Sequence, residues 1–308
     1  MSKASAPGKI ILFGEHAVVY GQPALAVPVT QVEAEVRIDK IFSPWIRINA
    51  PNIQLNEKLD ALAPTHPLAA TVRNTLHALE ADPPSSIAIL IRSSIPVASG
   101  LGSGAAVSVA IIRALAMYLK KDMTNEQVSA VAFETEKLYH GTPSGIDNTV
   151  VTYAKPVYFV KDQPIEVLKV KYPFTIVIGD TGIPASTKES VRDVRIQHHK
   201  KPDRYETLFA TIGSIARTAR QLIESGMPES LGPLMDENHA MLRSMKVSSP
   251  ELDHLVEAAR AGGALGAKMS GGGRGGNMIA LAQASNAGAV AKALRDAGAV
   301  NTIITRVS

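Results

Sequence analysis

Short aliphatic runs alternate with longer segments of helical spacing through the first half of the chain. The aliphatic runs predict β-strands, one of them by its apolar–polar alternation, over residues 10–13, 24–29, 32–38, 45–48 and 87–92. Apolar side chains that recur every three or four residues predict helices over 67–80, 105–118 and 124–139. Thr124 and Gln127 have the spacing of a capping box, which places the start of the third helix. This half therefore mixes strands and helices.

A turn-rich segment at 164–173 separates this half from a second pattern. Beyond it the sequence predicts a strand, four helices, two strands, a helix and a final strand, over 174–180, 187–199, 204–226, 228–245, 250–261, 267–270, 278–282, 286–297 and 302–307. Asp203 with Glu206 is predicted to cap the start of one of these helices. We expect two α+β domains, residues 1–168 and 169–308.

The composition of the 308 residues is that of an ordinary folded protein, with 45% hydrophobic and 19% charged side chains. The formal net charge of +4 suits an anionic ligand but falls short of a dedicated nucleic-acid surface. Cysteine is absent from the sequence, which excludes disulfides, thiolate catalysis and Cys-based zinc sites. The sequence has no signal-peptide core and no run of about eighteen apolar residues, so we expect a cytoplasmic protein without a membrane segment.

A basic cluster marks the end of the predicted helix 187–199; its members are Arg192, Arg195, His198, His199, Lys200, Lys201 and Arg204. Aromatic residues do not interleave with it beyond Tyr205, so a solvated helix end is a better interpretation than nucleic-acid binding. An acidic partner, such as a regulatory diphosphate, stays open. His66, His77 and His254 have no carboxylate or histidine at ligand spacing, which favours helix-surface or core positions over metal binding.

A glycine-rich segment at 96–106 lies between the predicted strand 87–92 and the predicted helix 105–118. Glycines bring backbone N–H groups close to one point, and a helix start adds its free amides and positive dipole end. The segment therefore suits phosphate binding, although a loop that only joins two elements stays open. It has neither the Walker pattern nor a dinucleotide fingerprint. The candidate phosphate-binding residues are Pro96, Ser99, Gly100, Leu101, Gly102, Ser103, Gly104, Ala105 and Ala106.

Phosphoryl transfer to an alcohol needs a triphosphate cradle, a carboxylate for Mg²⁺, a cation near the transferring group and a residue that orients or deprotonates the hydroxyl. Lys9 is the candidate cation, or else a solvated lysine at a strand end. Glu136 is a candidate carboxylate late on a helix, or else an exposed partner of His140. Asp147 follows a turn rich in Pro and Gly and is a second candidate, or else a turn-forming residue.

A further glycine run, 270–276, separates two predicted strands and holds more glycine than a hairpin needs. Close approach to a ligand or to the first glycine segment is the favoured interpretation. Together, the Gly-Glu-His-Ala-Val-Val-Tyr-Gly segment at 14–21, the glycine segment at 96–106 and the run at 270–276 resemble the GHMP kinases, the family that includes galactokinase and homoserine kinase. The segments 140–148, 180–188 and 238–253 add to the resemblance, which spans nearly the whole chain.

Within the family, the segment at 14–21 is most similar to members that phosphorylate mevalonate, and it lacks the Asp that galactokinases carry after Glu-His. The resemblance implies an N-terminal domain like the second domain of ribosomal protein S5, with ATP and substrate sites. It also implies a ferredoxin-like C-terminal domain and an active site in the cleft between the two. The implied reaction is ATP-dependent phosphorylation of the C5 hydroxyl of (R)-mevalonate in isoprenoid precursor biosynthesis, and the resemblance allows a homodimer.

The resemblance also implies roles for individual residues. Asp147 would be the catalytic base or orienting carboxylate, and Lys9 would lower the pKa of the hydroxyl and stabilise developing charge. Glu136 and Ser103 would bind Mg²⁺, and the segment 96–106 would bind the phosphates of ATP. The implied substrate-binding residues are Glu15, His16, Thr187 and Gly272.

Two departures from the family pattern concern the glycine segments. Gly104 stands where the family usually has the second serine of Gly-Leu-Gly-Ser-Ser, so either Ser103 or water completes the magnesium shell. Arg274 stands where many relatives have glycine, and either a position near the phosphates or one in solvent is open. Two other functions also stay open: a kinase for another acceptor, such as phosphomevalonate, homoserine or a sugar, and a nucleotide-binding sensor without catalysis.

Overall fold

The computed structural model describes residues 1–96, 99–141, 143–184 and 186–308, with the backbone alone for Tyr139 and His140. These residues form two compact units. Unit 1 comprises residues 1–8, 32–96 and 102–154, and unit 2 comprises 9–31, the described part of 97–101, and 155–308. Two long strands, β1 (Ser2–Phe13) and β2 (Ala24–Lys40), have residues in both units. The units are not contiguous in sequence, so the domain boundary after residue 168 stays a prediction.

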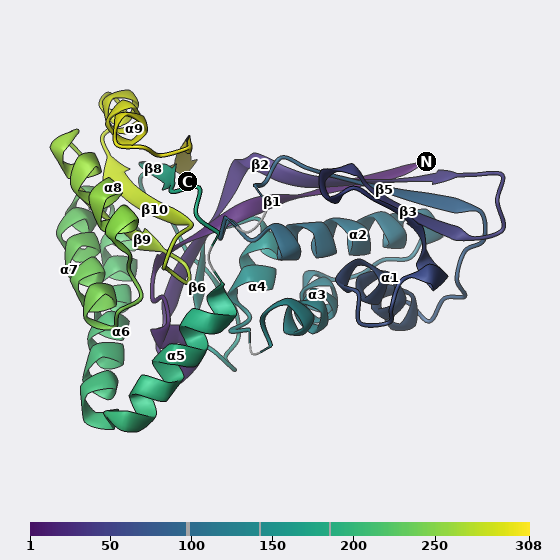
Figure 1. Ribbon diagram of the computed structural model, residues 1–308, viewed down its shortest axis with the longest axis horizontal. Coiled ribbons are helices and arrows are strands. Elements are labelled where there is room, and N and C mark those ends of the chain that lie inside the picture. The colour runs from purple at the N-terminus through teal and green to yellow at the C-terminus, as the bar shows by residue number, and fades with distance from the viewer. Residues whose placement is uncertain (97–98, 142, 185) are drawn as a thin grey trace. The chain divides into compact units, whose positions relative to one another are not determined.

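Unit 1 combines a sheet with a layer of helices. Its strand order is β4-β3-β5-β2, in which β3 and β5 are parallel and the other pairs antiparallel. Figure 1 shows the helices on one side of these strands. The elements are β3 (Ile46–Ala50), β4 (Leu55–Lys58), β5 (Ile87–Ser93), α1 (Pro67–Ala78), α2 (Ser103–Leu119), α3 (Asn125–His140), α4 (Ile146–Tyr153), and the short 3₁₀ turns η2 (Pro51–Ile53) and η3 (Leu59–Ala61).

The core of unit 1 follows from the sequence pattern. Ile87, Ile89 and Ile91 alternate along β5 and are buried, as expected for a sheet with one covered face. Helix α2 is buried nearly all round, and its many alanines permit close approach of neighbouring helices. The predicted capping box at the start of α3 is confirmed: Gln127 N donates to Thr124 Oγ1 at 3.3 Å, and Thr124 N donates to Gln127 Oε1 at 2.8 Å.

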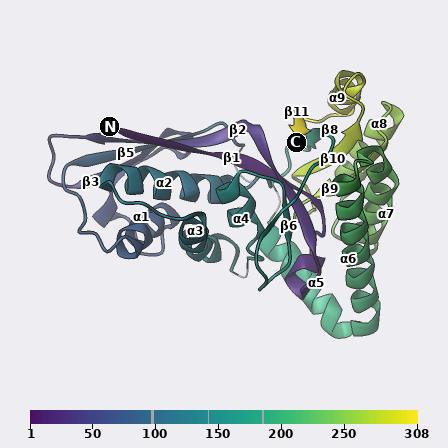
Figure 2. The same ribbon diagram turned by 180° about the vertical axis from the view of Figure 1, so that it is seen from behind.

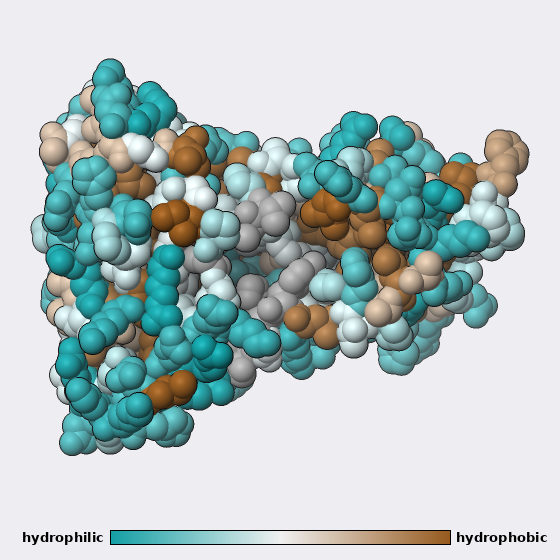
Figure 3. All heavy atoms as spheres, in the orientation of Figure 1, coloured by the Kyte–Doolittle hydropathy of each residue, from teal (hydrophilic) through white to brown (hydrophobic). Residues whose placement is uncertain are grey.

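Unit 2 contains a four-stranded antiparallel sheet in the order β11-β8-β10-β9. Helices α7, α8 and α9 pack on this sheet, α6 packs on α7, and α5 packs on α6 (Figures 1 and 2). Figure 3 shows a mainly hydrophilic surface over α6, α7 and α8, as expected for amphipathic helices. The elements are β8 (Phe174–Asp180), β9 (Gly266–Ser270), β10 (Asn277–Ala282), β11 (Asn301–Val307), α5 (Thr187–Lys200), α6 (Pro202–Ser225), α7 (Leu231–Ser244), α8 (Pro250–Ala261), α9 (Ala287–Asp296), and the 3₁₀ turns η1 (Ala17–Tyr20) and η4 (Pro228–Ser230).

Part of β2 also belongs to unit 2, where it pairs with β6 (Val157–Phe159), which in turn pairs with β7 (Glu166–Val167). The strands predicted at 24–29 and 32–38 are thus one strand, because no turn residue interrupts the run between them. The predicted cap Asp203 is wrong: α6 begins at Pro202, whose fixed φ suits a first helical turn, and Asp203 lies inside that turn. Within the described residues, no helix has the length and apolarity needed to cross a bilayer.

Candidate active site

A tight turn follows β1 and carries Gly14, Glu15 and His16. Gly14 has φ +99°, and a Cβ there would lie 2.5 Å from Ala24 Cα, so only glycine fits. His16 also has positive φ, at +61°, which is unusual for a residue with a side chain. Its ring is buried and bonds through Nε2 to the carbonyl oxygen of Gly272 at 3.0 Å. The turn is therefore held against residues 270–276, the third glycine run.

Glu15 forms an ion pair with Lys268 of β9, and both side chains are fully buried. Burial raises the pKa of the Glu15 carboxyl and lowers the pKa of the Lys268 amine, and the attraction between the two groups opposes both shifts. The backbone of Gly271 also lowers the pKa of the Glu15 carboxyl, although less than Lys268 does. Lys268 bonds to Oε1 of the carboxylate, while Oε2 is buried and has no hydrogen-bond partner among the described residues.

Thr187, the first residue of α5, lies against the same glycine run. A Cβ built on Gly272 would lie 2.8 Å from Thr187 Oγ1 and 3.0 Å from Thr187 Cα. Because Gly272 accepts the bond from His16 and touches Thr187, it joins the two residues. The structure thus brings together all four predicted substrate-binding residues, Glu15, His16, Thr187 and Gly272, within unit 2.

Lys9 lies within β1 and is 4% exposed, so the alternative of a solvated lysine at a strand end is wrong. Its backbone N–H donates to the carbonyl of Leu101 at 2.9 Å, which ties β1 to the first glycine segment. That segment also lies against the end of the third run. Asn277, directly after the run, donates through Nδ2 to the carbonyl of Ser99, and a Cβ on Gly276 would lie 3.0 Å from the same oxygen. Val97 and Ala98 of the segment lie outside the described residues.

The second half of the glycine segment opens helix α2. Gly102 is the N-cap at φ +74°, and as a glycine it has no side chain to cap the first turn, where Ser103 and Gly104 lie. Ala105 and Ala106 are buried beneath this turn. The first amides and the positive end of a 17-residue helix suit an anion.

Glu136 is 2% exposed on α3, so the alternative of an exposed partner is wrong. Leu138, two residues on, is instead 43% exposed. One helical position moves a side chain by about 100°, so the buried face runs through Ala132 and Glu136, four residues apart. A carboxylate in this environment suits a cation ligand or a proton acceptor.

Asp147 lies in the first turn of α4, which begins after Gly145 at φ +92°. The alternative of a turn-forming Asp-Asn pair is wrong, because both residues are helical. Asn148 Nδ2 donates to Ser129 Oγ at 2.8 Å and to its carbonyl at 3.1 Å, which fixes α4 against α3. The position of Asp147 within unit 1 is therefore set by its neighbour.

Comparison with known proteins places these features in a family. Residues 68–155 match the family described as GHMP kinases N terminal domain, and residues 219–300 match GHMP kinases C terminal. A mevalonate kinase of Pyrococcus abyssi is 37% identical over 99% of this chain and 95% of its own, and one of Thermococcus gammatolerans is 38% identical over 99% and 96%.

The chain belongs to the GHMP kinase family. Its α+β fold with two domains is confirmed by the crystal structure of L. major mevalonate kinase in complex with R-mevalonate, with a TM-score of 0.86, 30% identity, and coverage of 100% of this chain and 96% of that one. Lactococcus lactis galactokinase complexed with galactose shares the fold with a TM-score of 0.78 at 19% identity, covering 99% and 92%.

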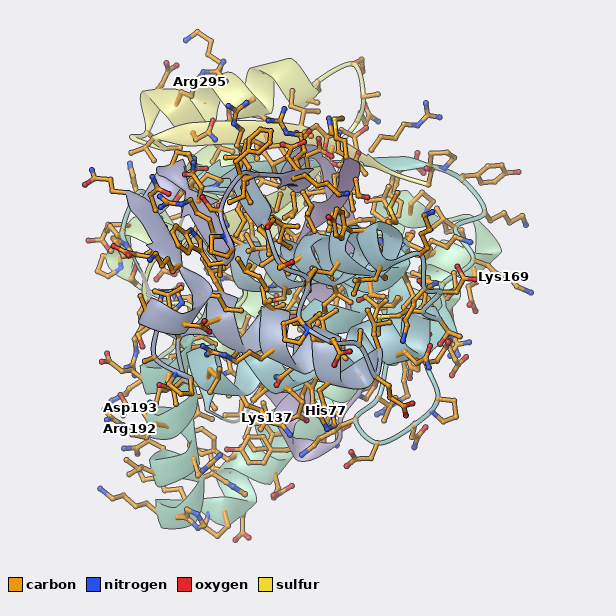
Figure 4. The ribbon with its side chains drawn as sticks, turned by 90° about the vertical axis from the view of Figure 1, so that its right-hand side faces the viewer. His77, Lys137, Lys169, Arg192, Asp193 and Arg295 are labelled. Carbon is orange, nitrogen blue, oxygen red and sulfur yellow. The ribbon has the colours of Figure 1, made fainter. Side chains whose placement is uncertain are left out.

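Arg274 is the charged residue of the third glycine run. Its Nη1 donates to Asp193 Oδ2 on α5 at 2.6 Å, and this bond lowers the pKa of the Asp193 carboxyl. Arg192 lies beside Asp193 on α5, with a separation of 3.5 Å between their charged groups (Figure 4). Arg274 is thus engaged by a carboxylate of α5.

Two site residues escaped the sequence argument. Lys268 lies in a short strand between Ala267 and Met269, and the reasoning that singled out Lys9, an unfavourable charge in a buried strand, applies to it as well. No sequence pattern singles out Asn277, because its hydrogen bond to the Ser99 carbonyl forms only once the fold places the two residues side by side. Histidine and carboxylate side chains, where described, form no group of three or more that would suit a resident metal ion.

Proposed function

We propose that this GHMP kinase transfers the γ-phosphoryl group of ATP to the C5 hydroxyl of (R)-mevalonate, giving 5-phosphomevalonate and ADP in isoprenoid precursor biosynthesis. The observation that carries the proposal is the match, at 36–38% identity and nearly full length, to relatives that bear the name mevalonate kinase. The structural match to an enzyme described as bound to R-mevalonate supports the same substrate.

The phosphates of ATP fit the glycine segment and the start of α2. Gly100 and Gly102 have φ +83° and +74°, so their amides take directions that a residue with a Cβ rarely adopts. The first turn of α2 adds N–H groups without a side-chain cap. In this proposal Ser99 to Ala106 bind the phosphates through their backbone, and the helix dipole favours the negative charge.

A magnesium ion fits the donor chemistry of unit 1. Magnesium in kinases is held by one or two carboxylates together with substrate phosphates, and the buried carboxylate of Glu136 meets that need. Ser103, in the first turn of α2, is the hydroxyl that would join it in place of the missing serine at Gly104. When bound, the ion would neutralise charge on the phosphate oxygens.

The alcohol is recognised through the Gly14–His16 turn. Burial lowers the pKa of His16 to about 4, so the ring is neutral at pH 7. A carbonyl can only accept, so the bond to Gly272 places the ring proton on Nε2 and leaves Nδ1 as an acceptor. Nδ1 is buried and has no hydrogen-bond partner among the described residues. We assign it to a substrate hydroxyl, with Thr187 and Glu15 nearby.

Asp147 and Lys9 carry the chemistry in this proposal. Phosphoryl transfer asks little covalent chemistry of the protein and depends on positioning and charge. Asp147 orients the attacking hydroxyl or accepts its proton, and the ammonium of Lys9 stabilises the charge that develops on the oxygen. No covalent enzyme intermediate is needed.

The test is an ADP-release assay with ATP and Mg²⁺ over mevalonate, phosphomevalonate, homoserine and galactose. We expect release that depends on mevalonate and on none of the other three. ADP release with homoserine alone would reject mevalonate as the substrate but leave the family assignment unchanged. No ADP release with any of the four alcohols would favour a nucleotide-binding sensor. Asp147→Asn is the matched control, because it replaces one carboxylate oxygen with an amide nitrogen and should abolish the mevalonate-dependent release of ADP.

A further inference from the structure

The side chains of Glu15 and Lys268 are 0% exposed, and they lie 253 positions apart in the chain. Charges removed from water are destabilising unless they are paired and hydrogen-bonded. An apolar pair of similar volume would fill the same space with no such penalty, so stability alone does not explain two buried charges. The two charges are better explained by orientation, because an ion pair fixes the direction of its side chains and an apolar pair does not.

The ion pair connects the two segments that position His16. Lys268 donates to Glu15 and to the carbonyl of Met269 at 2.7 Å, so its ammonium is fixed from β9. On the turn, Glu15 accepts from Lys268, which lies on the strand that leads into the glycine run. The next residue of the turn is held by the run itself, because His16 bonds to the carbonyl of Gly272 at 3.0 Å. Two successive residues of the turn are thus joined to β9 and to the glycine run.

The backbone at this turn needs such support. His16 has φ +61°, a region that costs a residue with a side chain free energy and persists only where surrounding contacts enforce it. A second contact comes from Ser270, whose hydroxyl accepts from Ile11 N at 3.2 Å and donates to Ile11 O at 2.9 Å. That contact fixes β1. Backbone bonds from Val18 N to Gly14 O at 3.0 Å and from Val19 N to His16 O at 3.2 Å close the turn locally, and the ion pair and the ring of His16 join it to β9 and the glycine run.

We propose that Lys268 is a positioning residue: its ion pair with Glu15 fixes the Gly14–His16 turn and so orients Nδ1 of His16 toward the substrate hydroxyl. The assignment of that hydroxyl to mevalonate rests on the proposed function. Lys268 itself touches no substrate. Its loss should therefore weaken alcohol binding while the affinity for ATP is retained, because Lys9, Leu101 and Asn277 hold the phosphate segment without it.

The kinetic test compares Lys268→Met with the double variant Glu15→Gln/Lys268→Met, which removes both charges and so avoids an unpaired buried carboxylate. For both we expect KM for mevalonate to rise at least about tenfold, the effect of losing one well-placed hydrogen bond, while KM for ATP stays within about twofold. The control is Lys292→Met, which removes an exposed ion pair with Asp296 in α9 and should change nothing. A wild-type KM for mevalonate in either charge-removing variant would overturn the proposal.

A second measurement does not depend on the substrate. The ring carbon resonance of His16, assigned with His16→Gln, should be a single sharp line in the wild type that does not titrate between pH 6 and 8. In the double variant we expect it to shift or broaden. An unchanged resonance would show that the pair does not position His16. A shifted resonance in a protein that fails to phosphorylate mevalonate would retain the positioning role and reject the substrate.

Discussion

At the scale of single residues, burial changes the meaning of three charged positions. Lys9, Glu136 and Lys268 are each under 5% exposed, although their sequence neighbours permit a solvated interpretation. A buried charge is stable only where the fold supplies compensating partners, so these positions are poor candidates for incidental surface residues. The candidate chemistry of the protein is concentrated in such positions.

Asp147→Asn and Lys9→Ala should each lower kcat for mevalonate by about 10²-fold to 10⁴-fold, the usual contribution of a proton acceptor or a charge-stabilising group. Circular dichroism should show an intact fold in both. Turnover near that of the wild type in either variant would remove its residue from the catalytic roles.

The buried histidines predict a dependence of stability on pH. Burial lowers the pKa of His16 and of His239 from 6.5 to about 4. Between these pKa values the unfolded chain binds more protons than the folded one. The free energy of unfolding is therefore highest above about pH 6.5 and falls as the pH is lowered toward 4. Each buried ring accounts for up to about 3 kcal/mol of this fall.

Urea titrations at pH 7.5 and 4.5 measure this dependence. His239→Gln should show a smaller loss of unfolding free energy between the two pH values than the wild type. The exposed His77→Gln, on the surface of α1 (Figure 4), is the matched control and should behave as the wild type. An equal pH dependence in all three proteins would contradict the assignment to buried rings.

At the scale of elements, the eight-residue helix α4 shows how packing supplies what helix propensity cannot. So short a helix is unstable alone. It is held near its start by Asn148 and at its end by Arg113 of α2, whose Nη2 donates to the carbonyl of Thr152 at 2.6 Å. These contacts determine the orientation of Asp147.

Asn148→Ala should therefore lower kcat by about tenfold or more through misplacement of Asp147, since small displacements of a reacting group are costly. It should also lower the free energy of unfolding by about 1–3 kcal/mol, because the partners of a buried amide are lost. Ser129→Ala removes only the 2.8 Å bond and keeps the carbonyl acceptor, so its effects should be smaller. Equal kinetics in Asn148→Ala and wild type would show that α4 is placed by other contacts.

The contact between the third glycine run and α5 gives another prediction. Gly272→Ala places a methyl group 2.8 Å from Thr187 Oγ1, which forces Thr187 or the glycine run to move. We expect KM for mevalonate to rise at least about tenfold, since one misplaced polar contact is worth about that factor. Gly288→Ala, in α9 with open space around the new methyl group, should instead leave KM unchanged and slightly stabilise the protein. A wild-type KM for mevalonate in Gly272→Ala would show that Thr187 does not contact the substrate.

At the scale of the whole molecule, the fold depends on apolar burial in two units rather than on covalent or metal cross-links. The sequence contains no cysteine, and the described side chains form no cluster suited to a resident metal. In the proposed function magnesium is held by Glu136 and Ser103 together with substrate phosphates, so it would serve the reaction and not the fold.

Removal of Mg²⁺ with EDTA should therefore abolish ADP release while the melting temperature without nucleotide changes by less than about 2 °C, the shift that corresponds to about 1 kcal/mol in a chain of this length. Scanning calorimetry with and without EDTA tests this. A large fall in the melting temperature would indicate a structural metal site.

The sequence alone determined the order and type of most elements, the family, and the residues that could carry chemistry. These depend on local periodicity, on capping residues such as Thr124, and on glycine-rich segments, all of which act over a few neighbouring positions. The element that sequence reasoning missed next to the site, α4, is too short to show a period, and it exists because α2 and α3 bind its two ends.

Only the tertiary structure decided which candidates lie together. His16, Gly272 and Thr187 meet because antiparallel pairing of β9 with β10 turns the third glycine run back beside the Gly14–His16 turn. The Glu15–Lys268 pair and the burial of Lys9 arise in the same way, from segments that are distant in the chain. Desolvation and hydrogen bonding depend on such neighbours in space, so no local pattern of residues could reveal them.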